Sequence, residues 1–274
     1  MPFFAIPFPS IDPVAVNFGP LPLRWYALAY IGGFVLGWAY LRFIAGRDAF
    51  WRQGQPRPSV NSIDDLLVYV AFGVIIGGRL GHVLIYDPGF YLSHPLEIFE
   101  TWKGGMAFHG GFLGALTGMA LFARRERLSM LTVMDLGAVV SPIGIFLGRL
   151  ANFIRPEMWG RPADVPWAMV FPGAGDAPRH PSQLYEAGLE GLALGIALWI
   201  ALRAGALVRP GLASGIFGVG YGLARTFCEF FREPDAAQEA LGGGLTKGMV
   251  LSFPMILVGL ILIVLSARRR ETLA

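Results

Sequence analysis

The sequence predicts an all-α, polytopic integral membrane protein with about seven transmembrane helices. Of its 274 residues, 54% are hydrophobic and only 15% are charged, whereas a soluble domain carries about 25% charged residues. The mean hydropathy is +0.55, and several apolar runs reach the roughly 20 residues that a helix needs to cross a bilayer. We therefore expect a single integral membrane domain, residues 1–274, with a small polar head segment at 150–183.

Seven apolar runs place the spans along the chain. They lie at about 24–41, 66–86, 109–123, 131–149, 184–203, 212–230 and 248–267. The third run, HGGFLGALTGMALFA, is short and rich in glycine. We expect it either to tilt against its neighbours or to begin below the membrane surface.

Several other classes of protein are excluded by composition. The single Cys228 excludes an internal disulfide and any CxxC motif. The N-terminus lacks a basic region and a small-residue cleavage site, so it is not a removable signal peptide. A pI near 9.2 would fit nucleic acid, but basic loops in a membrane protein more often reflect topology. No metal, cofactor or phosphate-loop motif is present, and we expect no cofactor, no metal and no nucleic-acid partner.

The basic residues predict the orientation, because cytoplasmic loops are enriched in Lys and Arg. With the N-terminus outside, the inner segments hold Arg42, Arg47, Arg52, Arg57, Arg124, Arg125, Arg127, Arg203, Arg209, Arg268, Arg269 and Arg270. The outer segments then hold fewer: Arg24, Lys103, Arg155, Arg161, Arg179, Arg232 and Lys247. We therefore expect the N-terminus outside and the C-terminus in the cytoplasm. This orientation gathers the polar residues of the spans at the outer leaflet.

Three arginines remain at membrane depth, namely Arg79, Arg149 and Arg225. An arginine at the centre of a spanning helix costs about 2.5–3.5 kcal/mol on insertion scales. Near a helix end this cost falls, because the side chain can extend to the headgroups. That simple explanation suits Arg79 best, whereas the other two have polar neighbours.

The stretch YGLARTFCEFFREPD surrounds Arg225. Tyr221, Arg225, Glu229 and Arg232 are spaced by four, four and three residues, which places them on one stripe of a helix. An Arg225–Glu229 ion pair within the helix would neutralise both charges. It would also allow Glu229 to orient Arg225 toward an anion.

The stretch GRLANFIRPEMWGR surrounds Arg149. Asn152 follows at i+3, and Pro156 prevents the helix from continuing. Glu157, Trp159, Gly160 and Arg161 then form a compact turn with both signs of charge. Anchoring at the membrane interface explains the tryptophan, but it explains Asn152 and Glu157 poorly.

Two further stretches contain polar residues near the predicted outer face. GGMAFHGG places His109 between glycine pairs, and small residues allow close approach of helices or of a ligand. A membrane histidine is most often a packing residue. RHPSQLYE precedes the fifth span, and its Ser182 has the position of a helix cap.

These residue types favour an anion-binding membrane protein. Arginine forks match phosphate oxygens in pairs, so a phospholipid headgroup or another anion is the expected ligand. The residue types alone do not identify a reaction.

The blocks LRWYALAYIGGF, GGMAFHGG, GRLANFIRPEMWGR, RHPSQLYEAGLEG and YGLARTFCEFFREPD extend over nearly the whole chain. In this order they resemble the prolipoprotein diacylglyceryl transferase family, whose signature is a GRxxNF block followed by WGR. The family pattern often reads GNFINGE where this chain has ANFIRPE. Ala151 and Arg155–Pro156 therefore depart from the pattern, while Arg149, Asn152 and Glu157 are kept.

The resemblance implies a transferase of the bacterial inner membrane that acts in lipoprotein biosynthesis. Such an enzyme moves the diacylglyceryl group of phosphatidylglycerol to the lipobox cysteine of a prolipoprotein signal peptide, and releases glycerol phosphate. The implied catalytic residues are His109, Arg149 and Arg225. The implied substrate-binding residues are Tyr26, Arg149, Asn152, Glu157, Gly160, Arg161, Tyr221, Glu229 and Arg232.

Two alternatives remain open at this point. Within the same reaction, His109 either accepts the thiol proton or only positions lipid while the arginine field favours the thiolate. Among other functions, a phospholipid-binding scaffold would need the arginines but not His109. An anion transporter is disfavoured, because the polar residues lie on one side rather than along a route through the membrane.

Overall fold

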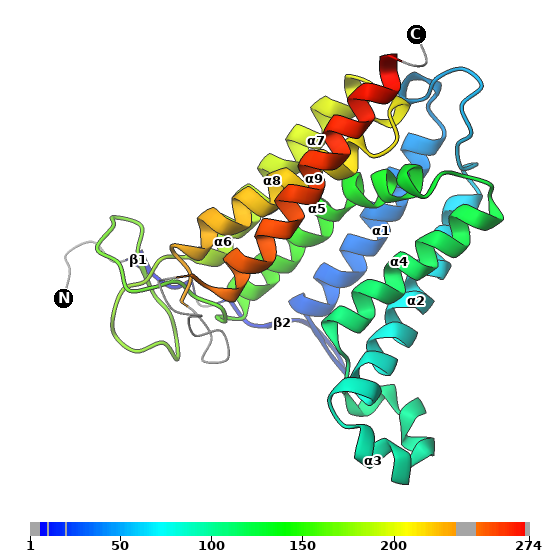
Figure 1. Ribbon diagram of the computed structural model, residues 1–274. Coiled ribbons are helices and arrows are strands. Elements are labelled where there is room, and N and C mark those ends of the chain that lie inside the picture. The colour runs from blue at the N-terminus through cyan, green and yellow to red at the C-terminus, as the bar shows by residue number, and fades with distance from the viewer. Residues whose placement is uncertain (1–5, 10, 20, 234–244, 272–274) are drawn as a thin grey trace. The chain divides into compact units, whose positions relative to one another are not determined.

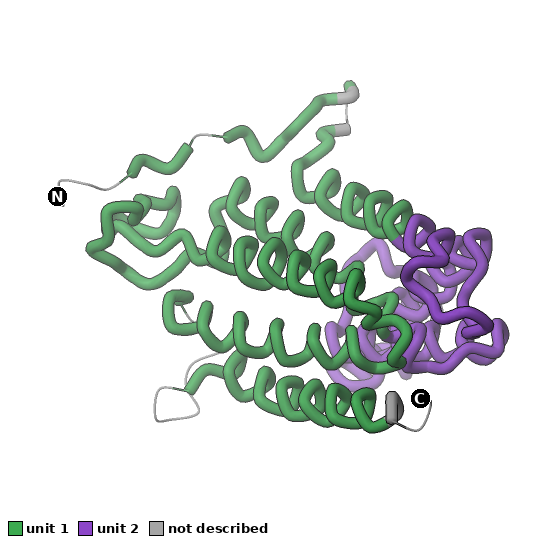
Figure 2. The backbone as a smooth tube through the Cα atoms, turned by 90° about the horizontal axis from the view of Figure 1, so that it is seen from above, with its two compact units in different colours: residues 1–40, 135–274 green, residues 41–134 purple. Residues whose placement is uncertain are grey.

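The computed structural model describes residues 6–9, 11–19, 21–233 and 245–271, and these fold as two compact units. Residues 1–40 and 135–274 make up the first unit, and residues 41–134 make up the second, as the two colours of Figure 2 show. Two units of helices can belong to one membrane domain, so the predicted single domain stays a prediction.

Helices dominate both units (Figure 1). The α-helices are α1 (Trp25–Ala45), α2 (Ser62–Ile85), α3 (Pro88–Ser93), α4 (Phe108–Arg125), α5 (Met130–Ile154), α6 (Ser182–Glu186), α7 (Leu194–Arg203), α8 (Leu212–Glu229) and α9 (Lys247–Glu271). A π-helical segment, η4 (Ala187–Ala193), joins α6 to α7 in one continuous helix. The short 3₁₀ helices are η1 (Asp48–Phe50), η2 (Pro95–Phe99), η3 (Thr101–Lys103) and η5 (Ala206–Val208).

The described residues of the first unit also form four short strands. β1 (Ile6–Pro7) pairs in parallel with β4 (Met169–Val170) of the head segment. β2 (Val14–Phe18) and β3 (Leu21–Arg24) form an antiparallel hairpin that leads directly into α1. The head segment is therefore tied to the N-terminal part of the chain by backbone hydrogen bonds.

Every predicted span coincides with a helix, which confirms the mainly helical fold. In the part of the chain that the structure describes, five helical stretches are long and apolar enough to cross a membrane: Trp25–Ala45, Ser62–Ile85, Met130–Ile154, Ser182–Arg203 and Lys247–Arg268. The other two helices are α4, which is rich in glycine, and α8, which contains Arg225 and Glu229. The coarser prediction of a multi-pass helical membrane protein is thus supported, and the number seven stays a prediction.

Small residues set the packing of the paired helices. In the second unit, α2 and α4 pack so closely that a Cβ atom on Gly114 would overlap the backbone carbonyl of Gly73. In the first unit, Gly215 and Gly218 of α8 lie against Gly259 of α9. Since lipid tails give helices no hydrophobic reason to associate, such close backbone contact supplies the van der Waals attraction.

Arg79 organises the second unit rather than extending to the headgroups. It is 5% exposed, and its guanidinium donates hydrogen bonds to the carbonyl oxygens of Glu97, Ile98, Gly104 and Gly105 at 2.5–3.2 Å. The guanidinium also lies 5.1 Å from the ring centroid of Tyr91. The sequence-based explanation for Arg79 was therefore wrong, because the segment after α2 folds back and supplies carbonyl acceptors.

Asp135 of α5 caps the first turn of α8 from a neighbouring helix. Its fully buried carboxylate accepts hydrogen bonds at 2.7 Å from the backbone amides of Gly211 and Ser214 and from the Ser214 hydroxyl. Gly211 has φ +95°, a conformation that favours glycine. These bonds satisfy amides that no helical carbonyl can reach.

We predict that Asp135→Asn lowers the thermal stability of the protein. An amide at this position turns an N–H toward one of the backbone amides, and an unsatisfied buried group costs about 1–3 kcal/mol. The melting temperature in detergent measures the effect. Ser214→Ala is the matched control, because it removes only the hydroxyl bond and should lower the melting temperature less. Equal melting temperatures for Asp135→Asn and the unmodified protein would contradict the capping role.

Candidate active site

Arg149 projects from the last turns of α5 onto two buried glutamates. Its Nη1 atom lies 3.0 Å from Glu186 Oε2, and its Nη2 atom lies 3.3 Å from Glu190 Oε2. Both carboxylates are completely buried, whereas the Arg149 side chain keeps 18% of its surface exposed. One arginine fork thus spans two carboxylates on the α6–η4 helix.

Arg225 of α8 reaches the same carboxylates from another helix. Its Nη1 atom lies 2.5 Å from Glu186 Oε1 and 3.6 Å from Glu190 Oε1. Its Nη2 atom pairs with Glu229 one turn later on α8, as the i+4 spacing predicted. Arg232 Nη1 adds a further contact, 3.6 Å from Glu186 Oε1.

These six side chains form a charge cluster, which we define as Arg149, Glu186, Glu190, Arg225, Glu229 and Arg232. Three cations face three carboxylates, so the formal charge of the cluster is zero. Removing one member of such a buried network leaves an uncompensated charge and costs about 3–5 kcal/mol. The arginines are therefore held in fixed positions before any ligand arrives.

The sequence analysis missed Glu186 and Glu190 as members of the site. The signal was available, because two carboxylates four residues apart in an apolar helix are costly unless they have partners. The predicted capping role of Ser182 was wrong as well. Ser182 is buried, and its hydroxyl donates to the carbonyl of Met158 at 2.9 Å.

A close helix contact brings Arg149 to its partners. Gly191 of η4 faces Phe146 of α5, and a Cβ atom on Gly191 would lie 2.7 Å from the Phe146 Cβ. Phe146 precedes Arg149 by three residues, so both lie on the same face of α5. The absence of a side chain at Gly191 therefore lets α5 approach the carboxylates closely enough for direct ion pairs.

The turn after α5 is built as the sequence predicted. The helix ends at Ile154, two residues before Pro156. Asn152 is 7% exposed and donates its amide to Glu157 Oε1 at 2.9 Å. Gln183 in turn donates to the Glu157 carbonyl at 2.7 Å. Asn152 and Glu157 thus bind each other in the turn that follows Arg149.

Gly160 and Arg161 join the head segment to the end of α8. Gly160 forms an antiparallel bridge with Arg232, and the Arg161 side chain donates to the Arg232 carbonyl at 3.0 Å. A Cβ atom on Gly160 would lie 2.5 Å from the His180 carbonyl oxygen. These two residues therefore tie the head segment to the backbone at Arg232, and their contact with substrate stays a prediction.

The head segment contains a second ion pair and a half-buried histidine. Arg179 pairs with Glu233 at 2.5 Å, and Trp159 Nε1 donates to the same carboxylate oxygen at 3.0 Å. His180 Nδ1 lies 3.0 Å from the Tyr185 hydroxyl. Burial lowers the pKa of His180 below its usual range. His180 thus connects the head segment to Tyr185 of α6.

Three further residues from the sequence analysis lie in the first unit, namely Tyr26, Tyr221 and Cys228. Tyr26 is the second residue of α1, and its hydroxyl lies 3.2 Å from that of Tyr30. Tyr221 lies one turn before Arg225 on the same face of α8. Its ring stacks on Phe217 with centroids 5.6 Å apart. Cys228 is fully buried, in agreement with a packing role.

His109 belongs to the second unit, apart in the chain from the charge cluster. It lies in the first turn of α4 and is exposed, with its ring 5.5 Å from that of Phe108. The neighbouring Gly110 packs against the backbone of Gly77. The glycines around His109 thus serve the contact between α2 and α4, and the role of the histidine itself stays a prediction.

Known proteins are similar to this one over nearly the whole length of the chain. Residues 13–265 match the family described as prolipoprotein diacylglyceryl transferase. The phosphatidylglycerol–prolipoprotein diacylglyceryl transferase of Methylocella silvestris is 60% identical over 97% of each chain. The proteins of that name from Beijerinckia indica (57% identical, 97% of this chain and 98% of the relative) and Rhodopseudomonas palustris (55%, 98% and 94%) are similar to almost the same extent. The chain therefore belongs to the prolipoprotein diacylglyceryl transferase family.

Proposed function

We propose that this protein transfers the diacylglyceryl group of phosphatidylglycerol to the lipobox cysteine of a prolipoprotein signal peptide, the first step of lipoprotein maturation. The charge cluster is the observation that supports this proposal most directly. It holds two arginine forks from different helices on the same carboxylate, that of Glu186. Family membership and the names of the relatives supply the substrates.

The reaction exchanges one bond for another. The cysteine thiolate attacks the glyceryl carbon, a thioether C–S bond forms, and the bond from that carbon to the phosphate oxygen breaks. The bonding pair leaves with glycerol phosphate, and the thiol proton passes to a base. Because the leaving group is already a stable anion, it needs charge stabilisation more than a proton.

Arg149 and Arg225 are the proposed phosphate-binding residues. Arg149 retains exposed surface, so it presents unused N–H donors beside its two glutamates. Since the cluster is neutral, an arriving phosphate competes with the carboxylates for the same guanidinium groups. Until a phosphate binds, the glutamates therefore hold each guanidinium group in the orientation that the phosphate requires.

His109 is the proposed base, and the alternative is that it only positions lipid. An imidazole nitrogen can accept the thiol proton near neutral pH. In the alternative, the proton passes elsewhere, and the arginine field alone favours the thiolate. The remaining proposed substrate-binding residues are Tyr26, Asn152, Glu157, Gly160, Arg161, Tyr221, Glu229 and Arg232.

The orientation is part of the proposal. We place seven spans in the bacterial inner membrane, with the N-terminus outside, the C-terminus in the cytoplasm and the active site facing the outer leaflet. Twelve of the basic residues then lie in inner segments and seven in outer ones, as counted above. A translocated signal peptide presents its cysteine on that side.

We predict that purified protein releases glycerol phosphate from phosphatidylglycerol only when a lipobox peptide is present. In this assay Arg149→Lys should fail nearly as badly as Arg149→Ala, with turnover reduced by about 10²-fold or more. A lysine cannot bridge Glu186 and Glu190 with a planar fork. Arg203→Lys, in the last turn of α7, is the matched control and should keep its turnover.

Two results would count against this assignment. Near-normal turnover of Arg149→Lys would mean that a point charge suffices. Phospholipid binding without any release of glycerol phosphate would favour a non-catalytic scaffold.

We predict that His109→Gln lowers turnover by about 10²–10⁴-fold, the range typical of lost general-base catalysis. The loss should shrink as pH rises toward the thiol pKa of about 8.5, because more of the substrate is then already thiolate. The measurement is a pH series of both proteins with one lipobox peptide. A ratio that stays constant with pH would remove His109 from the base role and leave positioning of lipid.

We predict that a reporter active only in the cytoplasm gives signal when fused after Ala274 and none when fused at Pro162. The distribution of arginines between the predicted loops is the physical reason. A reporter active only outside the cytoplasm, at the same two positions, is the control for expression. The reverse pattern would place the charge cluster at the inner leaflet and overturn the proposed orientation.

A further inference from the structure

Met158, in the turn after α5, has an unusual backbone conformation. Its φ angle is +58°, in the left-handed region, which costs a residue with a Cβ atom about 1–2 kcal/mol. Glycine is the residue that adopts this conformation freely. Among the residues that the structure describes, Arg127 is the other non-glycine residue with a positive φ angle. The contacts around Met158 must therefore offset the cost of its conformation.

Two buried side chains at the start of α6 hold this turn. The Ser182 hydroxyl donates to the Met158 carbonyl at 2.9 Å. The Gln183 amide donates to the Glu157 carbonyl, one residue earlier, at 2.7 Å. Both side chains are completely buried, and Glu186 follows one turn later on the same helix. The start of α6 therefore fixes the position of Met158 relative to the Glu186 carboxylate.

The side chain of Met158 lies against Arg149. Its sulfur atom is 3.9 Å from Arg149 Nη1, at the distance of an N–H···S hydrogen bond. The same nitrogen lies 3.0 Å from Glu186 Oε2. Nη1 carries two N–H groups, so one serves the carboxylate and the other serves the thioether. Because a thioether sulfur is a weak acceptor, the second N–H keeps most of its capacity to bind an anion.

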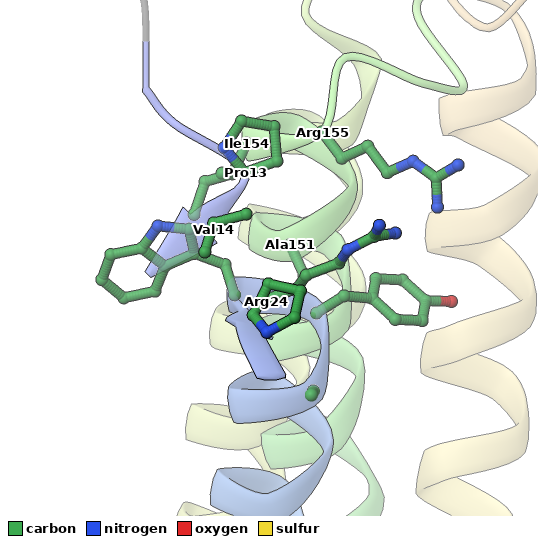
Figure 3. Close-up of a pocket in the computed structure, with 10 residues that line it drawn as sticks. Pro13, Val14, Arg24, Ala151, Ile154 and Arg155 are labelled. Carbon is green, nitrogen blue, oxygen red and sulfur yellow. The ribbon is translucent and has the colours of Figure 1, made fainter. Parts of the chain in front are cut away.

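The side chains of the turn lie in different directions. Ile154 and Arg155 line a pocket together with Pro13 and Arg24 of the N-terminal segment (Figure 3). Met158 instead extends onto the guanidinium group in the charge cluster. A substitution at Met158 therefore changes the cover of that guanidinium group and leaves the lining of the pocket as it is.

The contact between Met158 and Arg149 can be exchanged for a stronger one. Met158 is 38% exposed, and its unbranched side chain is flexible. The side chain can therefore move aside while the bonds to Ser182 and Gln183 hold the backbone. A water molecule or an amide oxygen in the same place would form a hydrogen bond to a charged group, which contributes about 1.5–3 kcal/mol. Displacing a thioether costs less than displacing either of them.

We propose that Met158 is a positioning residue for phosphate binding at Arg149. Its thioether covers one N–H of the guanidinium group until an oxygen of the phosphatidylglycerol phosphate takes its place. This role rests on the phosphate binding proposed above for Arg149. Binding then exchanges a weak hydrogen bond for a charge-assisted one. A strong acceptor at position 158 would compete with the phosphate, whereas an apolar side chain of similar size would not.

The variant that tests this role most directly is Met158→Gln, because its amide oxygen is a strong acceptor on a chain of similar length. Titration of the purified protein with phosphatidylglycerol, followed by native mass spectrometry, measures Kd. We expect Kd to rise about tenfold, equivalent to about 1.4 kcal/mol. In the transfer assay, KM for phosphatidylglycerol should rise while kcat stays the same, because ground-state binding is lost. Met130→Gln, the same change at the first residue of α5, is the matched control and should bind normally.

Two further variants separate this role from a purely structural one. The conservative Met158→Leu keeps an apolar cover of similar volume, so it should restore Kd and KM. Met158→Gly suits the left-handed backbone, so its melting temperature should be equal or higher. Its Kd should nevertheless rise, because water then reaches the uncovered N–H. A purely structural methionine would leave Kd unchanged in each of these proteins.

Unchanged Kd for Met158→Gln, with an unchanged melting temperature, overturns the role of Met158. If this variant has a lower melting temperature, Met158→Gly becomes the deciding probe, and its unchanged Kd has the same meaning. A fall in kcat without a change in KM also counts against the proposed exchange. The titration contains no peptide, so an unmodified protein without turnover would contradict the transfer reaction and leave the test of Met158 intact.

Discussion

The arrangement of the first unit depends on the ion pairs that the Glu186 carboxylate forms. Its two oxygens face Arg149 on α5 and Arg225 on α8, and Arg232 approaches as well. A completely buried carboxylate is tolerated only with such partners. The side chain of Glu186 therefore holds together α5, its own helix and the end of α8. The head segment is attached to the same place, because Gly160 and Arg161 bind the backbone at Arg232.

The protein buries arginine in two different ways, with different consequences for charge. In the first unit, carboxylates neutralise Arg149 and Arg225, so the positions of the guanidinium groups are fixed without a net positive charge. In the second unit, Arg79 is held by backbone carbonyls, so its positive charge is solvated but not cancelled. Backbone carbonyls thus fold a loop around Arg79, whereas carboxylates from other helices hold Arg149 and Arg225.

Much of the fold could be predicted from local pattern, because apolar runs of helix length report burial in lipid directly. The Arg225–Glu229 pair was equally predictable, since both partners lie on one helix at i+4. Glu186 and Glu190 were missed because their partners come from other helices, and the sequence does not state which helices touch. Arg79 and Ser182 were misinterpreted for the same reason: their acceptors are backbone carbonyls brought close only by tertiary folding.

The π-helical segment η4 has a consequence for the continuous helix that contains it. Glu186, Glu190, Leu194, Leu198 and Leu202 recur every fourth residue, and all are buried. In a regular α-helix, four residues turn about 400°, so such a stripe drifts by about 40° at each step. A π turn contains more residues than an α turn, so it removes part of that drift. The two glutamates and the three leucines therefore lie on one side of the helix. The length of this segment therefore sets the register of the leucines: losing one residue there would rotate them by about 100° out of their core.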